Sequence, residues 1–346
     1  MGKSKLTLLI DGNWLLMSRL SVLNGKYQDD NDMCRELKML MIKSIEVVLR
    51  QFPVIDNIIF VSDCGSWRNG VEKPSFITED YKGNRVKSED IDWDLIFSNF
   101  EDFINKLKSS GITTSKEIGI EGDDWAWYWS TKLNSEGTNV MIWSKDKDLT
   151  QLVHTTKDKC FTICWSKESG VIAEKIEEEE LDYLFNYEYS VNETLFSNIV
   201  EKSKGIEYIN PKDIIIDKII RGDKGDNIFP IIEKKSNTNP EKSFRVYKKD
   251  LDNTIDVHND DNIHEYIEKI LKSKSYAGKV EKKENDIFEH FKYNTILVEL
   301  NKKNYPKEIL DIFENYSTYN CTKDISEAKY KINAEANAIT SILDII

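Results

Sequence analysis

Three short apolar runs, each followed within three residues by an aspartate, most constrain how this chain can fold. The runs are Leu6–Ile10, Asn57–Ser62 and Asn139–Trp143, and the aspartates are Asp11, Asp63 and Asp146. Helix-like stretches separate the runs, for example residues 33–51, in which apolar residues recur at helical spacing. This alternation predicts an α/β fold with a central, mostly parallel sheet flanked by helices. Because ligands bind at the carboxyl edge of an open parallel sheet, we expect the aspartates at that edge.

The stretch from residue 121 to residue 152 adds acids to the same part of the fold. Five carboxylates stand at the ends of an expected helix and an expected strand: Glu121, Asp123, Asp124, Asp146 and Asp148. Carboxylates held this close repel one another, and hard divalent cations such as Mg²⁺ convert the repulsion into coordination. A single aspartate after a strand is usually a helix cap or a turn residue. Three such aspartates together with the acidic triplet favour a metal site.

A second acidic signal follows a well-marked helix. Asn210 and Pro211 predict the start of this helix, and Gly222 stands just past its end. The chain continues as GDKGDN, in which Asp223 and Asp226 are three positions apart in a turn and can converge on one ion. Calcium-binding loops use a longer ligand run that closes with a glutamate, which is absent here. These two aspartates are therefore further candidate ligands for a divalent cation.

A long polar segment, residues 64–92, separates the second apolar run from the next expected helix. It interleaves cations with aromatic residues: Arg68, Lys73, Lys82, Arg85 and Lys87 with Trp67, Phe76 and Tyr81. Connections this long in a compact domain are usually functional or disordered. Because cations hold phosphates and aromatic rings stack on bases, the composition suits a segment that binds single-stranded nucleic acid. A solvated loop is the alternative that composition leaves open.

Composition and charge limit the class of protein. The chain has 346 residues, a formal net charge of −13 and no apolar run near the ~20 residues of a membrane span, so we expect a cytoplasmic protein without a membrane partner. The negative charge does not exclude nucleic acid, because acids committed to metal ions leave the lysines to form a local basic track. Lysines gather after Ile231, including Lys234 and Lys235, although the acidic run 250–261 interrupts them.

The cysteines do not indicate a disulfide framework or a zinc site. They are an odd, scattered set, which predicts reduced thiols: Cys34, Cys64, Cys160, Cys164 and Cys321. Cys160 and Cys164 lie near His154, but their spacing is not that of a zinc-ligand pair, and the sequence has no second pair. We therefore predict that they are buried thiols.

Six motifs, taken in order, resemble those of the metal-dependent 5′ nucleases. They are LLIDGN at 8–13, FVSDCGSWR at 60–68, YKGNR at 81–85, EGDD at 121–124, SKDKDLTQL at 144–152 and GDKGDN at 222–227. That superfamily includes flap endonucleases, the 5′-nuclease domain of bacterial DNA polymerase I and phage RNase H enzymes. Within it, the chain most resembles the T-even type of phage RNase H, which also matches in DWDLIF at 92–97 and YNTILVEL at 293–300. The resemblance covers most of residues 1–310 and implies a PIN-like 5′-nuclease fold with a helical arch or bridge and a mainly helical C-terminal part.

The resemblance also implies two Mg²⁺ ions, for which we expect Mn²⁺ to substitute. The ligands carried over for the first ion are Asp11, Asp63, Glu121 and Asp123, with Asp124 in the outer shell, and those for the second are Asp146, Asp148, Asp223 and Asp226. Lys82 and Arg85 match residues that steady the scissile phosphate, so we expect them to be catalytic together with Asp146. The residues expected to contact nucleic acid are Arg68, Tyr81, Lys82, Arg85, Lys87, Lys224, Lys234 and Lys235.

Two features depart from the family pattern. Polymerase-type relatives follow GDxxDN with a glycine-rich hairpin that holds the downstream duplex and a potassium ion, whereas this chain continues with IFPIIEKKSN at 228–237. We therefore predict no potassium site, and a different grip on duplex DNA through the lysines after Glu233. Residues 177–209 look like an insertion relative to the phage enzymes.

The predicted function is a Mg²⁺-dependent 5′ to 3′ exonuclease and flap endonuclease with RNase H activity. Such an enzyme would hydrolyse phosphodiesters at the 5′ ends of nicked, flapped or RNA-primed duplexes in phage DNA replication. One alternative is a catalytically silent relative that binds DNA by its structure, and the presence of all the expected acids disfavours it. The other is a PIN-type ribonuclease, which the chain length, the basic segment and GDKGDN disfavour.

The motifs also predict how the chain is organised. We expect a catalytic α/β domain over residues 1–230, with an arch or bridge at 64–92, and a mainly helical DNA-binding region over residues 231–346. The expected partners are branched or nicked DNA and RNA/DNA hybrids, with a single-strand DNA-binding protein or a sliding clamp as candidate protein partners. We expect a monomer, located in the host-cell cytoplasm if a phage encodes it.

Overall fold

The computed structural model describes residues 5–27, 29–86, 88, 90–155, 160–166, 170–173, 199, 201–203, 205–235, 243–316 and 319–343. Most of the predicted insertion at 177–209 lies outside these residues. Contacts divide the chain into two compact units. Unit 1 comprises Met1–Gly65, Lys87–Ile209 and Asp311–Ile346, and unit 2 comprises Ser66–Val86 and Asn210–Leu310.

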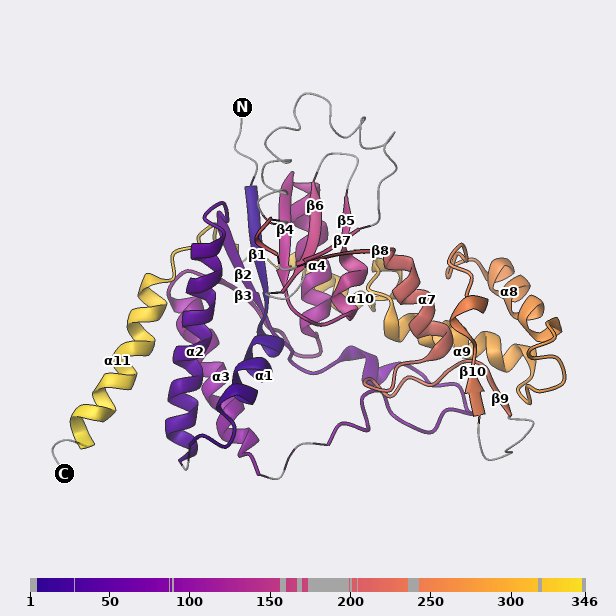
Figure 1. The fold of residues 1–346 in the computed structure, drawn as a ribbon, viewed down its shortest axis with the longest axis horizontal. Coiled ribbons are helices and arrows are strands. Elements are labelled where there is room, and N and C mark those ends of the chain that lie inside the picture. Colours follow the sequence, from indigo (N-terminus) through magenta and orange to yellow (C-terminus); the bar gives the residue numbers. More distant parts are fainter. Residues whose placement is uncertain are drawn as a thin grey trace. The chain divides into compact units, whose positions relative to one another are not determined.

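Unit 1 is organised around one large sheet (Figure 1). Its strands are β1 (Lys5–Asp11), β2 (Asn57–Val61), β3 (Thr113–Ser115), β4 (Thr138–Trp143), β5 (His154–Thr155), β6 (Phe161–Trp165), β7 (Gly170–Ala173) and β8 (Ile206–Ile209). They follow the order β3-β2-β1-β4-β6-β7-β8, and β5 pairs with β6. The first five strands in this order are parallel, whereas β7 runs antiparallel to β6. The predicted α/β fold with a mostly parallel central sheet is therefore confirmed.

The three apolar runs singled out in the sequence form adjacent strands. They are β2, β1 and β4, each of which is mainly apolar and, apart from the exposed Lys5, buried along its length. Such continuous apolar runs are typical of parallel strands covered by helices on both faces. In the register of the sheet, Asp11 lies opposite Val61, and Ile10 lies opposite Trp143. The carboxyl ends of these strands are therefore aligned at one edge of the sheet.

Helices cover the two faces of this sheet (Figure 1). The helices of unit 1 are α1 (Gly12–Leu23), α2 (Asp30–Gln51), α3 (Trp93–Ser109), α4 (Gly122–Ser135), η2 (Asp148–Leu152) and α11 (Ser326–Leu343). Leu8 and Ile10 pack into a core with α1, α2 and α3. Successive side chains of a strand point to opposite faces, so Leu9 points to the other face, where α4 buries Trp125 and Trp129.

Unit 2 is mainly helical. Its elements are η1 (Trp67–Gly70), α7 (Pro211–Arg221), β9 (Glu233–Lys235), β10 (Ser243–Arg245), η3 (Lys248–Asp250), α8 (Asp260–Lys272), α9 (Glu284–Val298) and η4 (Lys302–Asn304). The next helix, α10 (Lys307–Asn315), begins just after Pro306. Apolar residues of α7, α8 and α9 form one core, in which Tyr81 also takes part. The predicted helical character of the C-terminal part is confirmed.

The segment 64–92 is a bridge of non-regular chain in its described residues, with η1 as its one short helix. Its residues Ser66–Val86 pack with Asn210–Leu310 in unit 2. The predicted domain boundary at residue 230 stays a prediction.

Two smaller expectations concern the thiols and the membrane. Cys160 and Cys164 are both buried thiols, as predicted. No helix in the described part of the chain combines the length and the apolar character that crossing a membrane requires.

Candidate metal centre

The acids of unit 1 stand where strands end and helices begin. Asp11 is the last residue of β1, and its side chain caps α1. Asp63 follows β2 by two residues, and Asp146 follows β4 by three. Glu121 caps the N-terminus of α4, whose first turn carries Asp123. Since β2, β1 and β4 are neighbours and parallel, their carboxyl ends place these acids at one edge of the sheet.

Asp63 is held by hydrogen bonds to both carboxylate oxygens. Its Oδ2 accepts from Asn13 Nδ2 at 2.7 Å, and its Oδ1 accepts from the backbone N–H of Gly122 at 2.6 Å. A Cβ at Gly122 would lie 3.0 Å from Asp63 Oδ1, so a side chain here would crowd the carboxylate. The same Asn13 accepts hydrogen bonds at its Oδ1 from Ser62 Oγ at 2.8 Å and from Asp63 N at 3.1 Å. Asn13 therefore fixes both the backbone and the side chain of Asp63.

Asp11 is buried and has hydrogen-bonding partners on both oxygens. Oδ1 accepts from the backbone N–H of Trp14 at 2.9 Å, and Oδ2 accepts from Ser144 Oγ at 2.7 Å. Burial is the main cause that raises the pKa of Asp11 to about 7. The two hydrogen bonds lower this pKa, whereas the charges of Asp63 and Asp146 raise it further. Three acids from three adjacent strand ends therefore repel one another at this position.

Asp146 and Asp148 form a turn that is connected to Asp11. The backbone N–H of Asp146 donates to Ser144 Oγ at 2.9 Å, so the Ser144 hydroxyl links this turn to the Asp11 carboxylate. Asp146 Oδ1 in turn accepts from the backbone N–H of Asp148 at 2.9 Å. The Cys164 thiol has its pKa raised by burial first, and then by the charges of Asp146 and Asp123. Asp123 and Asp146 therefore both lie near the Cys164 thiol.

Glu121 and Asp124 have a local structural role at the start of α4. They form a reciprocal capping box, in which the Glu121 backbone N–H donates to Asp124 Oδ2 at 3.1 Å. Asp124 is fully buried, and Glu121 is 6 % exposed. Among the described residues of unit 1, no three acidic side chains lie within 4.8 Å of one another. Groups such as Ser144 and Gly122 thus connect the segments that carry these acids.

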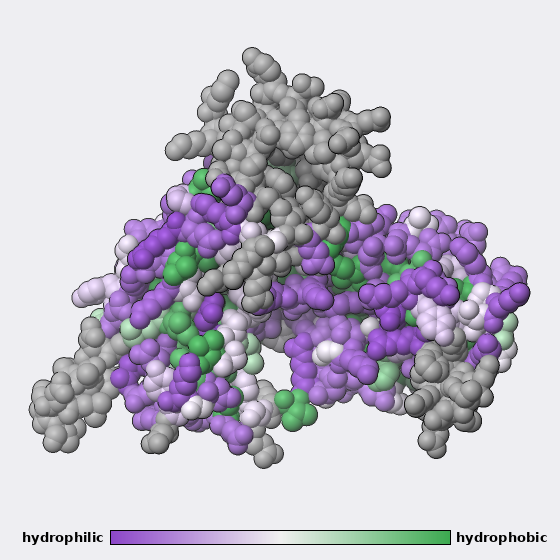
Figure 2. Space-filling view, viewed as in Figure 1, coloured by the Kyte–Doolittle hydropathy of each residue, from purple (hydrophilic) through white to green (hydrophobic). Residues whose placement is uncertain are grey.

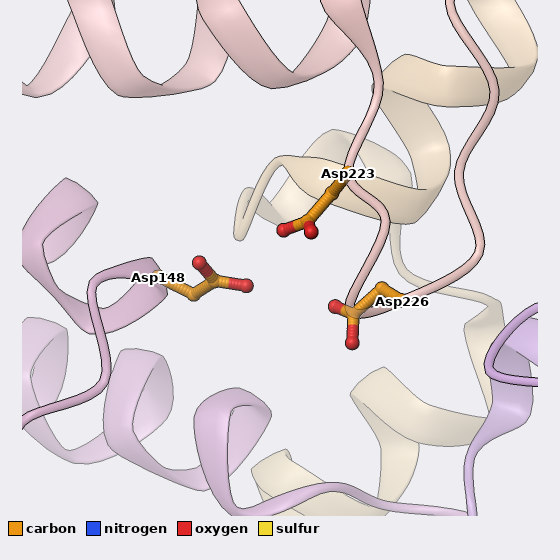
Figure 3. Close-up of side chains that lie close together, drawn as sticks. All are labelled: Asp148, Asp223 and Asp226. Carbon is orange, nitrogen blue, oxygen red and sulfur yellow. The ribbon is translucent and has the colours of Figure 1, made fainter. Parts of the chain in front are cut away.

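The GDKGDN loop of unit 2 follows α7. Figure 3 shows the carboxylates of Asp223 and Asp226 on this loop, and also Asp148 at the start of η2. Gly222 ends the helix with a φ of 69°, and a Cβ there would lie 2.3 Å from the carbonyl oxygen of Ile228. The loop then closes through two backbone hydrogen bonds between Asp223 and Ile228. Glycine is therefore required at the point where helix becomes loop.

Cations of unit 2 neutralise both loop aspartates. Lys218 Nζ lies 2.5 Å from Asp223 Oδ2, and Arg85 Nη2 lies 2.6 Å from Asp226 Oδ1. Burial raises the pKa of Asp223, but the Lys218 ammonium and the backbone N–H groups of Gly225 and Asp226 outweigh burial and lower it overall. Asp223 is thus held ionised, as a metal ligand needs to be.

The segment that carries the predicted phosphate-binding residues is hydrogen-bonded to the same loop within unit 2. Lys82, with a φ of 56°, donates its backbone N–H to the carbonyl oxygen of Asp226 at 2.8 Å. Asn84 Nδ2 donates to the carbonyl oxygen of Lys224 at 2.7 Å, and Asn227 Nδ2 donates to that of Asp80 at 2.9 Å. The Arg85 side chain therefore lies beside Asp226, whereas the Lys82 ammonium lies over the Tyr81 ring.

Other residues predicted to contact nucleic acid differ in their accessibility. Tyr81 is 8 % exposed and Arg68 only 2 %, and Arg68 Nε donates to the Leu297 carbonyl oxygen at 3.0 Å while its guanidinium lies over the Trp67 ring. Lys224 is exposed. Lys87 and the side chains of Lys234 and Lys235 lie outside the described part of the structure. Burial gives Arg68 and Tyr81 a packing role, and their predicted contacts with nucleic acid stay predictions.

Three polar residues of the site were not singled out in the sequence. Asn13, Ser144 and Lys218 each hold a predicted metal ligand, as described above. Asn13 and Ser144 lie within two residues of a predicted ligand in their motifs, which is the only signal that marks them. A polar residue at such a position is usually a turn residue, so sequence alone does not distinguish them.

Comparison with known sequences gives a family for this arrangement. Residues 6–182 match the family model described as 5′-3′ exonuclease, N-terminal resolvase-like domain. The 5′-3′ exonuclease of Buchnera aphidicola subsp. Schizaphis graminum is 28% identical over 180 residues, which cover 51% of this chain and 58% of that protein. The 5′-3′ exonuclease of Buchnera aphidicola subsp. Acyrthosiphon pisum is 31% identical over 115 residues, covering 33% and 37% respectively. The chain thus spans well under two thirds of the length of either relative.

Solved structures show a similar fold over nearly the whole chain. The T5 D15 protein co-crystallised with metal ions has a TM-score of 0.53 at 17% identity, covering 95% of this chain and 99% of that one. T5 5′-exonuclease with bound zinc ions has a TM-score of 0.52 at 17% identity and the same coverage. A complex of the bacteriophage T5 D15 flap endonuclease with DNA and metal ions has a TM-score of 0.51 at 17% identity, covering 96% and 100%.

At 17% identity the solved structures show the fold alone, and they confirm the predicted 5′-nuclease fold. The closer resemblance to the T-even type of phage RNase H stays a prediction. The family model spans just over half of the 346 residues. The chain belongs to the 5′-3′ exonuclease family, whose N-terminal resolvase-like domain it carries over residues 6–182.

Proposed function

We propose that the protein is a Mg²⁺-dependent 5′ to 3′ exonuclease and flap endonuclease that also removes RNA from RNA/DNA hybrids. The observation that carries this proposal is the meeting of charges from three parallel strand ends. Asp63 and Asp146 both act electrostatically on the buried Asp11, although 52 and 135 positions separate them from it in the chain (63 − 11 and 146 − 11). A fold holds such a repulsive arrangement only when function needs it, and two-metal phosphodiester hydrolysis needs it.

The donor set fits hard divalent cations. Every candidate ligand is a carboxylate, and Mg²⁺ prefers oxygen ligands. The residues that would hold the first ion are Asp11, Asp63, Glu121 and Asp123, and those proposed for the second are Asp146, Asp148, Asp223 and Asp226. A cation beside Asp11 would oppose the burial and the repulsion that raise its pKa, and so keep this carboxylate ionised. Asp124 is committed to the capping box, which supports a role outside the coordination shell.

The ions would supply an activated water and would neutralise charge that develops on the phosphate. The residues of the chain would position that phosphate. Lys82 and Arg85 would donate charge-assisted hydrogen bonds to its oxygens. Arg85 bonds Asp226 while its side chain is 57% exposed, so it can exchange this partner for a phosphate. Asn13 and Ser144 would hold the carboxylates of Asp63 and Asp11 throughout the reaction.

The proposed substrates are the 5′ ends of nicked or flapped duplexes and of RNA primers on DNA, in phage replication. The motif resemblance and the fold shared with a flap endonuclease that binds DNA support this choice. The experiment is cleavage of 5′-labelled nick, flap and RNA/DNA hybrid substrates with Mg²⁺, with Mn²⁺ and with EDTA. We expect cleavage with either metal and none with EDTA. No cleavage of any substrate at stoichiometric protein and 10 mM Mg²⁺, roughly a saturating level for a weakly held ion, would refute the proposal.

An Asp146→Ala variant separates this proposal from its alternatives. We expect the variant to bind flapped DNA and to lose cleavage, whereas a silent DNA-binding relative would show binding without cleavage in the unsubstituted protein too. A PIN-type ribonuclease would instead cut unstructured RNA in preference to flapped DNA. We also propose a monomer that recruits a single-strand DNA-binding protein or a sliding clamp, which light scattering and pull-down with purified partners would test.

A further inference from the structure

Unit 1 contains a pocket that the metal chemistry does not use. It lies between α1, α2 and the carboxyl ends of β4 and β6, and has a volume of about 530 Å³. This volume is in the range of pockets that hold small organic ligands. Its lining includes Trp14, Trp143, Trp165, Arg19, Lys43 and Lys145. In Figure 2, hydrophobic side chains lie among hydrophilic ones over α1 and α2, and Val47, which lines the pocket, is 58% exposed.

One wall of the pocket is aromatic. The rings of Trp14 and Trp143 meet edge to face with centroids 5.8 Å apart, and those of Trp143 and Trp165 lie 6.4 Å apart. Trp143 and Trp165 are buried, so their positions are fixed by packing, whereas Trp14 is half-buried. Trp14, which packs against the buried Trp143, therefore offers flat apolar area for an aromatic ligand at little cost in conformational entropy.

The charged part of the lining is cationic. Arg19, Lys43 and Lys145 line the pocket, and no acidic residue among the described residues does. This is notable in a chain with 61 acidic and 48 basic residues. Arg19 Nε and Trp165 Nε1 are buried and have no hydrogen-bonding partner among the described residues.

The pocket shares a turn with the candidate metal centre. Trp14 gives its backbone N–H to Asp11, while its ring lines the pocket. Trp143 and Lys145 line the pocket, whereas Ser144 between them bonds to Asp11. An occupant would therefore lie next to the carboxylates without touching their oxygens.

We propose that this pocket binds one nucleotide, with its base against the indoles and its phosphate on Arg19 and Lys43. The lining selects a ligand that is aromatic at one end and anionic at the other. The choice of a nucleotide among such ligands rests on the proposed nuclease function. The nucleotide is either a free mononucleotide or one unit of a single strand. Both carry an aromatic base and an anionic phosphate.

The test is equilibrium binding in EDTA, where the proposed metal chemistry cannot contribute. The probes are dAMP, a six-nucleotide DNA strand, deoxyadenosine and inorganic phosphate, each titrated calorimetrically into the whole protein. We expect dAMP or the strand to bind more tightly than phosphate or the nucleoside. Binding of dAMP assigns the free nucleotide, and binding of the strand alone assigns a unit of a strand. No binding of either, or equal binding of phosphate and dAMP, would overturn the proposal.

Variants locate the binding. Arg19→Gln should weaken it about tenfold or more, because a charge-assisted hydrogen bond to phosphate is lost. Lys43→Gln is exposed and should fold normally, so it tests the same contact if Arg19→Gln does not fold. Arg50→Gln is the matched control, an exposed cation on α2 outside the pocket, and should bind like the unsubstituted protein. Unchanged binding in both pocket variants would also overturn the proposal. Cleavage assays on the same proteins report separately on the nuclease function.

Discussion

Replacing Asn13 by alanine should weaken metal binding, although Asn13 is not itself a proposed ligand. Its side chain makes three hydrogen bonds, of 2.7, 2.8 and 3.1 Å, to Asp63 Oδ2, Ser62 Oγ and Asp63 N. Net contributions are about 0.5–1.5 kcal/mol for a neutral bond and about 1.5–3 kcal/mol for one to a charged group. Asn13 and Asp63 are half-buried, so the lower ends apply, and we expect a loss of about 2–3 kcal/mol in the free energy of unfolding.

The effect on the metal should exceed a mere loss of stability. Groups that orient metal ligands typically change metal affinity about 10- to 100-fold when removed, so calorimetry with Mg²⁺ and with Mn²⁺ should show a change in that range. Asn99→Ala is a matched control, because Asn99 is a half-buried asparagine of α3 that bonds only to the Leu95 carbonyl oxygen. If folded Asn13→Ala binds Mg²⁺ within twofold of the unsubstituted protein, the reasoning about Asp63 is wrong.

Three further predictions concern unit 2. Arg85→Gln should change the free energy of unfolding by less than about 1 kcal/mol, since the Arg85 side chain is 57% exposed, yet lower the cleavage rate of a flap substrate at least tenfold. An unchanged rate would remove Arg85 from the proposed site. Gly222→Ala should lower the free energy of unfolding in urea by more than about 2 kcal/mol, because Gly222 has a positive φ and lies close to the carbonyl of Ile228. Gly278→Ala, with a φ of 68° and open space around it, should lower it by about 1 kcal/mol. Equal losses in the two variants would contradict this reasoning. Burial, and then the Lys282 charge, lower the pKa of His290 from its ordinary 6.5 to about 3. As the pH falls, the unfolded chain therefore takes up a proton before the folded chain does. The free energy of unfolding should then drop between about pH 6.5 and pH 3. From pH 7 to pH 5 the protein should therefore lose about 2 kcal/mol more than His290→Gln, and parallel losses in urea midpoints would refute this.

The strand ends of the metal centre could be predicted because their signal is local and repeated. A continuous apolar run such as residues 57–61 predicts a buried strand, and the parallel arrangement then places the next acid at the carboxyl edge. The start of α7 was equally clear, because Asn210 caps the helix and Pro211 is its first residue. In these cases a few neighbouring residues determine the local structure.

The contacts that hold the acids could not be predicted in the same way. Ser144 bonds to Asp11 across 133 positions of sequence, and Asn84 bonds to Lys224 across 140. Such pairs depend on how distant segments pack, and one serine or asparagine beside a turn has no pattern that marks its partner. The burial of Arg68 could not be predicted either, because a cationic side chain in a polar segment is typical of an exposed loop. The structure shows it buried, with its Nε donating to the Leu297 carbonyl oxygen.

The pocket in unit 1 illustrates a further limit. Trp14, Trp143 and Trp165 come from three distant segments, and only the fold brings them together. Helical periodicity predicts that α2 turns an apolar face to the core, but it does not predict a gap between that helix and its neighbour. Pockets arise from imperfect packing of elements, which depends on side-chain volumes across the whole core.

The most direct measurement is the anomalous scattering of Mn²⁺ in crystals of the protein. The account predicts a difference-density peak at the carboxyl edge of the unit 1 sheet, about 2.1 Å from carboxylate oxygens of Asp11 and Asp63, and its loss in an Asp63→Ala crystal. A fully soaked crystal with no peak at these carboxylates, or with Mn²⁺ bound only elsewhere, would contradict the claim that the strand-end acids form a metal centre.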